Sequence, residues 1–182
     1  ARVQDGKGDG AMRSAACQQI AVLVDEDGIA ANDPEFKPVL AGVVAQLPDL
    51  RSQVVLAACS ALTDICEAVG DQQAMERPMR EEVLPTLLKV VGNGNKVLAG
   101  AGRDCWPTVL GVSHFDSMLK VLASTYKETK QRPIKHLCVA SMCYALRCWP
   151  MEVLSPVAKL LEDALVPAAS NAAVEVRALA RD

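Results

Sequence analysis

Segments of similar helical pattern follow one another along this chain, and this repetition is the feature that most limits the folds open to it. The clearest segment covers residues 51–69, where apolar residues recur at intervals of three and four. Such spacing places them on one face of a helix. The apolar face consists of Val55, Cys59, Leu62, Cys66 and Val69. Gly70 follows as the residue that ends the helix.

The same spacing predicts further helices on both sides of this one. Their expected ranges are 12–24, 36–47, 80–91, 96–110, 115–124, 133–149 and 152–165, with a last helix that starts near residue 172. Helix 36–47 is expected to pair with helix 12–24, and Ala16 and Val97 are expected to face inward. Nowhere does the chain keep the alternation of apolar and polar residues that is typical of a half-buried strand.

Glycine and proline predict where several of these helices begin, end or bend. Gly6, Gly8 and Gly10 predict a flexible lead into the first helix. Trp106-Pro107 is expected to bend or interrupt helix 96–110, because proline lacks the N–H that a helix interior uses.

The composition fits stacked helices better than packed sheets. Apolar residues make up 51% of the chain, but aromatic residues only 3%. A core built from Ala, Val and Leu suits helices that approach closely, whereas sheets favour aromatic and β-branched residues. Most of the seven cysteines occupy apolar positions, which predicts buried free thiols in a reduced, cytosolic protein.

Basic residues mark a regular period. Arg13, Arg51, Lys96, Lys135 and Arg177 are separated by 38, 45, 39 and 42 residues. This is the period of HEAT and armadillo repeats, and it predicts an all-α solenoid of HEAT-type repeats, about four to five in number, within one domain over residues 1–182. Equivalent loops of stacked repeats line up along one edge, so these residues predict a positive strip there.

Net charge and hydropathy limit the classes of partner. The net charge is −3 and the isoelectric point is about 5.5, which gives no indication of nucleic-acid binding. Charged residues interrupt every apolar run before it could span a bilayer, so no membrane association is expected. The chain starts at Ala1 and its terminal repeats look incomplete, which suggests a piece of a longer protein.

The residues favour neither a metal site nor catalysis. Cys138, Cys143 and Cys148 are five positions apart, which rotates each by about 140° from the last, so they cannot converge on one ion. Neither His114 nor His136 belongs to a recognisable nucleophile or metal motif. We therefore expect no enzyme activity, no catalytic residue and no cofactor.

Three stretches resemble one family. The stretch from Asp49 to Leu62, DLRSQVVLAACSAL, is similar to the second-repeat loop and helix of TOG domains in the CLASP family of microtubule regulators. The stretch LPTLLKVVGN from Leu84, followed by KVLA from Lys96, resembles that family's third repeat. Val174 to Arg177, followed by Arg181, resembles its fifth.

This resemblance implies a flat paddle of HEAT repeats that binds tubulin through the loops within its repeats. It implies contacts from the following residues: Arg13, Arg51, Ser52, Gln53, Asn95, Lys96, Lys130, Arg132, Lys135 and Arg177. A monomeric domain in the cytoplasm, on the cytoskeleton, is then expected. Because tubulin is acidic, an edge of Arg and Lys would favour both encounter and orientation.

One position departs from the family. Its first loop usually has a Trp three residues before the Arg, but Gly10 stands there in this chain. Large aromatic side chains often dominate a protein interface. The alternative hypothesis is therefore a HEAT-repeat scaffold that binds a different protein and has no affinity for tubulin.

Overall fold

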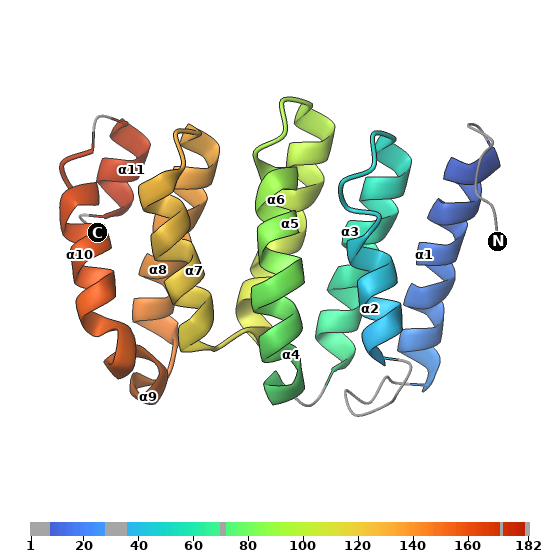
Figure 1. Cartoon of the computed structure of the whole chain (residues 1–182), viewed down its shortest axis with the longest axis horizontal. Coiled ribbons are helices and arrows are strands. Elements are labelled where there is room, and N and C mark those ends of the chain that lie inside the picture. Colours follow the sequence, from blue (N-terminus) through green and yellow to red (C-terminus); the bar gives the residue numbers. More distant parts are fainter. Residues whose placement is uncertain (1–7, 28–35, 70–71, 172, 181–182) are drawn as a thin grey trace. The chain divides into compact units, whose positions relative to one another are not determined.

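The computed structural model describes residues 8–27, 36–69, 72–171 and 173–180, and these ranges contain helices and no strand. The chain divides into two compact units, Ala1–Val112 (unit 1) and Ser113–Asp182 (unit 2). Each unit is built from helices packed side by side (Figure 1), which confirms the predicted all-α fold of helical repeats. Gly6, Gly70, residue 172 and Arg181, named in the predictions above, lie outside the described ranges.

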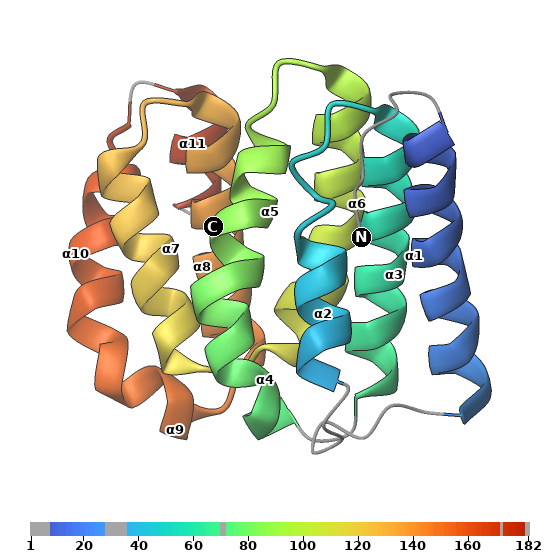
Figure 2. The ribbon, with the colours of Figure 1, turned by 45° about the vertical axis from the view of Figure 1, so that its right-hand side comes forward.

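Unit 1 arranges its helices in two layers. Its elements are α1 (Gly8–Asp27), α2 (Phe36–Val44), α3 (Ser52–Ala68), α4 (Gln72–Pro78), a π turn (Met79–Val83), α5 (Leu84–Val91) and α6 (Lys96–Val112). α3 packs against α1 on one side and α6 on the other, whereas α2 covers α3 and α5 covers α6. Figure 2 shows α1, α3 and α6 in one layer and α2 and α5 in the second.

The core of unit 1 uses the predicted apolar face of α3. Val55, Cys59, Leu62 and Cys66 are each at most 4% exposed, and they pack between the neighbouring helices. Burying one such side chain contributes roughly 1.5–3 kcal/mol. The repeated three-and-four spacing is therefore what holds the unit together.

Several sequence predictions for unit 1 were wrong in detail. α1 begins at Gly8, so Gly8 and Gly10 lie inside the helix and not in a flexible lead. α2 packs on α3 and the π turn, so it is not the partner of α1. α6 runs through Pro107 without interruption. Ala16 and Val97 are exposed, because each lies on the solvent side of its helix.

The π turn explains how Pro85 fits within a long helical segment. α4, the π turn and α5 follow each other without a gap from Gln72 to Val91. In a regular helix, residue 85 would donate an N–H to the carbonyl of Glu81, which proline cannot do. The wider turn, closed by the N–H of Leu84 donating to the carbonyl of Met79, lies directly before this proline.

Unit 2 repeats the two-layer arrangement. Its elements are α7 (Asp116–Glu128), α8 (Arg132–Cys148), α9 (Met151–Leu154), a 3₁₀ turn (Ser155–Val157), α10 (Ala158–Ala168) and α11 (Val174–Leu179). α7 pairs with α8, α10 packs on α7, and α11 packs on α8. Pro150 ends α8 as predicted, and Trp149 beside it is buried. None of the described helices combines the length and the apolar character that crossing a bilayer requires.

Candidate protein-interaction site

The predicted contact residues of unit 1 gather at one end of its helices. They lie at the start of α1, in the loop between α2 and α3, and in the loop between α5 and α6, and these three segments share one end of the unit (Figures 1 and 2). Short connections between antiparallel helices bring them there. The contact residues that the sequence predicts for unit 1 therefore lie on a common edge of that unit.

Arg13 and Arg51 are held by two carboxylates of the same unit. Arg13 donates from Nε and Nη2 to Asp9 at 2.8 and 2.6 Å, and from Nη1 to Asp49 at 3.3 Å. Arg51 donates from Nε to Asp49 at 3.1 Å, and its Nη2 lies 3.5 Å from Asp9. We call Asp9, Arg13, Asp49 and Arg51 the charge quartet; its formal charges sum to zero.

The charge quartet is partly withdrawn from solvent. The side chains of Asp9 and Asp49 are 16% and 7% exposed, whereas those of Arg13 and Arg51 are 35% and 39% exposed. Burial would raise the pKa of Asp49, but hydrogen bonds from the backbone and side chain of Arg51, with the charge of Arg13, hold that pKa below its usual value. The hydrogen bond to Asp9 raises the pKa of Arg13. The two guanidinium groups are thus positioned but electrostatically compensated.

Gly10 leaves room for the Arg51 side chain. A Cβ placed on Gly10 would stand 2.7 Å from Nη1 and 2.8 Å from Cδ of Arg51, closer than such atoms approach. Nη1 of Arg51 is buried at this contact without a hydrogen-bond acceptor in the described part of the chain. Any larger residue at position 10 would displace Arg51, so the glycine and the arginine position depend on each other.

The other candidates of unit 1 differ in exposure and partners. Gln53 is exposed and Ser52 half-buried, both in the first turn of α3. Asn95 is the N-cap of α6: its Oδ1 accepts the N–H of Val97 at 2.9 Å. Lys96 follows it, exposed, and makes no salt bridge within the described residues. Lys96 is therefore the uncompensated cation at this end of α6.

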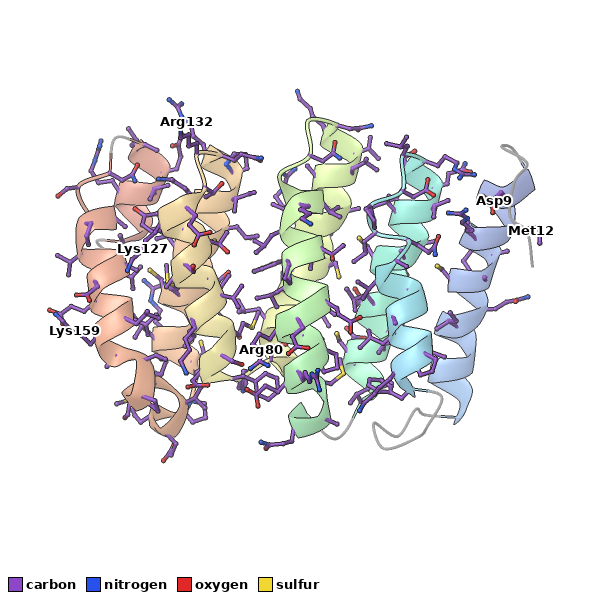
Figure 3. All side chains as sticks on the ribbon, in the orientation of Figure 1. Asp9, Met12, Arg80, Lys127, Arg132 and Lys159 are labelled. Carbon is purple, nitrogen blue, oxygen red and sulfur yellow. The ribbon has the colours of Figure 1, made fainter. Side chains whose placement is uncertain are left out.

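Two exposed cations of unit 2 lie in and beside the loop between α7 and α8. Lys130 is in this loop and Arg132 is the first residue of α8; neither makes a salt bridge within the described ranges. Figure 3 shows Arg132 at the end of unit 2 where this loop lies, with Lys159 far from it on α10. Both candidates are thus free to meet a partner.

The remaining candidates of unit 2 have local packing roles. Nζ of Lys135 lies 5.2 Å from the ring centre of Tyr126, a cation–π contact. The hydroxyl of Tyr126 accepts a hydrogen bond from Nδ2 of Asn171 at 3.1 Å. Arg177 donates from Nη1 to the carbonyl of Asn171 at 2.7 Å, so it secures the loop before α11. These contacts join the end of α7 and the start of α8 to the loop before α11.

Lys96 and Arg132 occupy electrostatically unfavourable positions. Each is the first residue of its helix, where the backbone dipole presents partial positive charge, and neither first turn contains an acidic residue. Such a placement costs about 0.3–1 kcal/mol relative to a neutral residue. Residues whose position lowers the stability of the fold are candidates for contacts with a binding partner.

Sequence reasoning missed the carboxylates and the aromatic support of the site. Asp9 and Arg13 are four residues apart in one helix, a spacing that could have indicated their ion pair. Asp49 stands two residues before Arg51, as in turns where an Asp side chain accepts a nearby backbone N–H. No sequence signal links Asp9 to Arg51 or Tyr126 to Asn171, because folding alone brings these pairs together.

The described side chains do not assemble the groups that metal binding requires: no three His, Cys, Asp or Glu among them gather at one point. None of the seven cysteines, all of which lie in the described ranges, forms a disulfide, and Cys17, Cys59, Cys66, Cys105 and Cys138 are buried. What the loop ends offer chemically is hydrogen-bond donors and positive charge. That chemistry suits recognition of an acidic surface.

Comparison with known proteins finds similarity to a segment of larger ones. No protein-family profile matches the chain. It is 24% identical over 182 residues to CLIP-associating protein 1 of Xenopus tropicalis, a match that covers 98% of this chain and 12% of that protein. It is 25% identical over 133 residues to CLIP-associating protein 1-B of Xenopus laevis, covering 73% of this chain and 9% of that protein. The chain thus spans a small part of the length of both relatives.

Proposed function

We propose that this chain is a TOG-like module that binds αβ-tubulin through the loop ends of its helical repeats and so regulates microtubule dynamics. It acts by binding and not by catalysis, as a monomer, in the cytoplasm on the cytoskeleton. The main support is the set of exposed cations that make no salt bridge within the described residues: Lys96 and Arg132 at helix starts, and Lys130 in the loop between α7 and α8. The similarity to CLIP-associating proteins over most of the chain supports the same proposal.

The physical reason is electrostatic complementarity. Tubulin presents an acidic surface, and cations held on short loops between rigid helices attract it and fix its orientation. The net charge of the whole chain is −3, so this attraction depends on where the cations stand and not on their number. Binding should therefore weaken as salt screens these charges.

One observation favours a second candidate, a scaffold for a different protein. Gly10 provides no aromatic anchor, and the backbone there is covered by Arg51, whose charge is compensated by Asp9 and Asp49. Unit 1 therefore offers less net positive charge than its arginines suggest. In this reading the cations of unit 2 bind an acidic partner other than tubulin.

A charge-reversal experiment tests the first proposal. The double variant Lys96→Glu/Arg132→Glu changes two unpaired helix-start cations. Its matched control, Arg103→Glu/Arg147→Glu, makes the same charge change at exposed positions elsewhere on α6 and α8. Binding to unpolymerised αβ-tubulin is measured by size-exclusion chromatography and a titration of affinity at low and physiological salt.

The two variants should behave differently. We expect the helix-start variant to lose at least about tenfold in affinity, equal to about 1.4 kcal/mol, and the control to stay near wild type. Equal losses in both would mean that only total charge matters and would contradict the proposed contacts of Lys96 and Arg132. If the wild-type chain formed no complex with tubulin even at low salt, the scaffold hypothesis would be favoured. The charge-reversal variants would then serve to test other candidate partners.

A further inference from the structure

Leu50 is fully presented to solvent at the candidate edge of unit 1. Its exposed fraction is 95%, the highest among the large apolar side chains described; the next is Met12 with 73%. The residue lies in the loop between α2 and α3, directly before Arg51. A single exposed leucine is common on protein surfaces, so its surroundings decide whether it has a role.

The turn that presents Leu50 is well fixed on both sides. Leu47 is 1% exposed and anchors the loop in the core, and the N–H of Asp49 donates to the carbonyl of Gln46 at 3.1 Å. Oδ1 of Asp49 accepts the N–H of Arg51 at 2.8 Å, so the backbone after Leu50 is tied to the side chain of the residue before it. Leu50 is thus held outward by a rigid turn and has little freedom to fold back.

Leu50 lies beside the charge quartet. It lines an open hollow of about 550 Å³ together with Ala45, Pro48 and the charge-quartet residues Arg13, Asp49 and Arg51. The two arginine side chains are more than a third exposed even though both are ion-paired. An apolar side chain beside positioned arginines is an arrangement found in many protein interfaces.

We propose that Leu50 is the apolar anchor of unit 1 in the complex with αβ-tubulin, where it enters an apolar pocket whose rim accepts hydrogen bonds from Arg13 and Arg51. This rests on the proposed function and adds to it a contact that does not depend on charge. Leu50 replaces an aromatic anchor at the start of α1, where Gly10 leaves space for Arg51 and for no larger side chain.

The neutrality of the charge quartet gives this contact a distinct signature. Because two arginines and two aspartates cancel, burying Leu50 beside them brings little net charge to the partner. Screening by salt should therefore leave the contribution of Leu50 unchanged, while it reduces the contribution of Lys96 and Arg132. The two kinds of contact can be separated by measuring each variant at two salt concentrations.

The experiment uses the whole 182-residue chain and titrates αβ-tubulin at about 50 and 200 mM salt, a range over which screening changes strongly. The test variant is Leu50→Ser, with Leu50→Met as the conservative variant. Met151→Ser is the control, because Met151 is also apolar and 68% exposed but lies in α9. Circular dichroism checks that helicity is unchanged, as expected at so exposed a position.

We expect Leu50→Ser to weaken binding by about tenfold or more at both salt concentrations, and Leu50→Met and Met151→Ser to bind like wild type. If Leu50→Ser binds like wild type while Lys96→Glu/Arg132→Glu does not, the anchor is overturned and the proposed function stands. A loss of the same size in Met151→Ser would also overturn it. Failure of the wild-type chain to bind tubulin would overturn both.

Discussion

Gly102 of α6 lies against Val91 of α5 with no space between them. A Cβ on Gly102 would stand 3.0 Å from Cγ2 of Val91 and 3.2 Å from its backbone nitrogen. Side-chain atoms can shift by a few tenths of an ångström, but the backbone of a packed helix resists doing so. The glycine therefore sets how closely α5 and α6 approach.

A pair of alanine variants in α6 should separate helix propensity from this packing. Gly100→Ala places a methyl group where nothing lies within 4 Å, and should stabilise the chain by up to about 1 kcal/mol. Gly102→Ala gains the same propensity but overpacks the contact with α5, at a cost of about 1–3 kcal/mol. Urea denaturation of both variants measures the difference in their free energies of unfolding. Equal values would show that α5 can shift at little cost in free energy.

A double-mutant cycle should reveal the coupling between Gly10 and Arg51. Replacing Gly10 by Ala favours the helical backbone, but in the wild-type chain it also pushes the Arg51 side chain away from Asp9. The gain in stability from helix propensity is therefore offset. In the Arg51→Ala background no such displacement occurs, and the full gain of up to about 1 kcal/mol should appear. Unfolding free energies should give a coupling of about 0.5–1 kcal/mol. Strict additivity would mean that the two residues do not touch.

Asp49 should make the stability of the chain depend on pH in the acidic range. Its pKa in the folded state lies below the ordinary value of 3.8, so its charged form stabilises the fold. This contribution is present at pH values well above the ordinary pKa of 3.8 and is lost as pH falls through the lowered pKa of the folded state. Asp49→Asn should lower stability at pH 7 and flatten the decline below pH 4, measured by thermal unfolding across pH. If the stability of Asp49→Asn declined below pH 4 as steeply as that of the wild-type chain, this role of Asp49 would be contradicted.

The seven thiols should differ widely in reactivity. Cys148 is exposed, whereas burial raises the pKa of Cys138 to about 12 and also raises that of Cys66. Because the thiolate is the reactive form, a thiol reagent at neutral pH should modify Cys148 first. We expect Cys148→Ser to lose the fast phase of labelling; a fast phase of full size in that variant would mean that another thiol, such as the half-buried Cys143, reacts as readily.

The helices were predictable because their apolar spacing is local. The face of α3 at Val55, Cys59 and Leu62 could be read directly, and Pro150 marked the end of α8. The prediction failed at Pro107, which lies inside α6. Pro107 leaves α6 continuous because packing against α3 and α5 compensates for one missing hydrogen bond.

The candidate site was less predictable because its partners lie far apart in sequence. Arg13 and Arg51 are predicted members of a positive strip, and the structure gives both of them Asp9 and Asp49 as partners. A period of about 40 residues locates loops but does not tell which side chains meet across them. For the same reason, the outward position of Leu50 becomes apparent only in the folded turn.

The π turn has a consequence for helical phase. Met75, Met79, Val83, Leu87 and Val91 follow at intervals of four and are all buried. Four residues of an α-helix turn by about 400°, so each interval would carry the apolar side about 40° further around the axis. The π turn at Met79–Val83 inserts one residue and takes back about 100° of that drift. A constant interval of four can therefore stay on one side of the helix over its whole length.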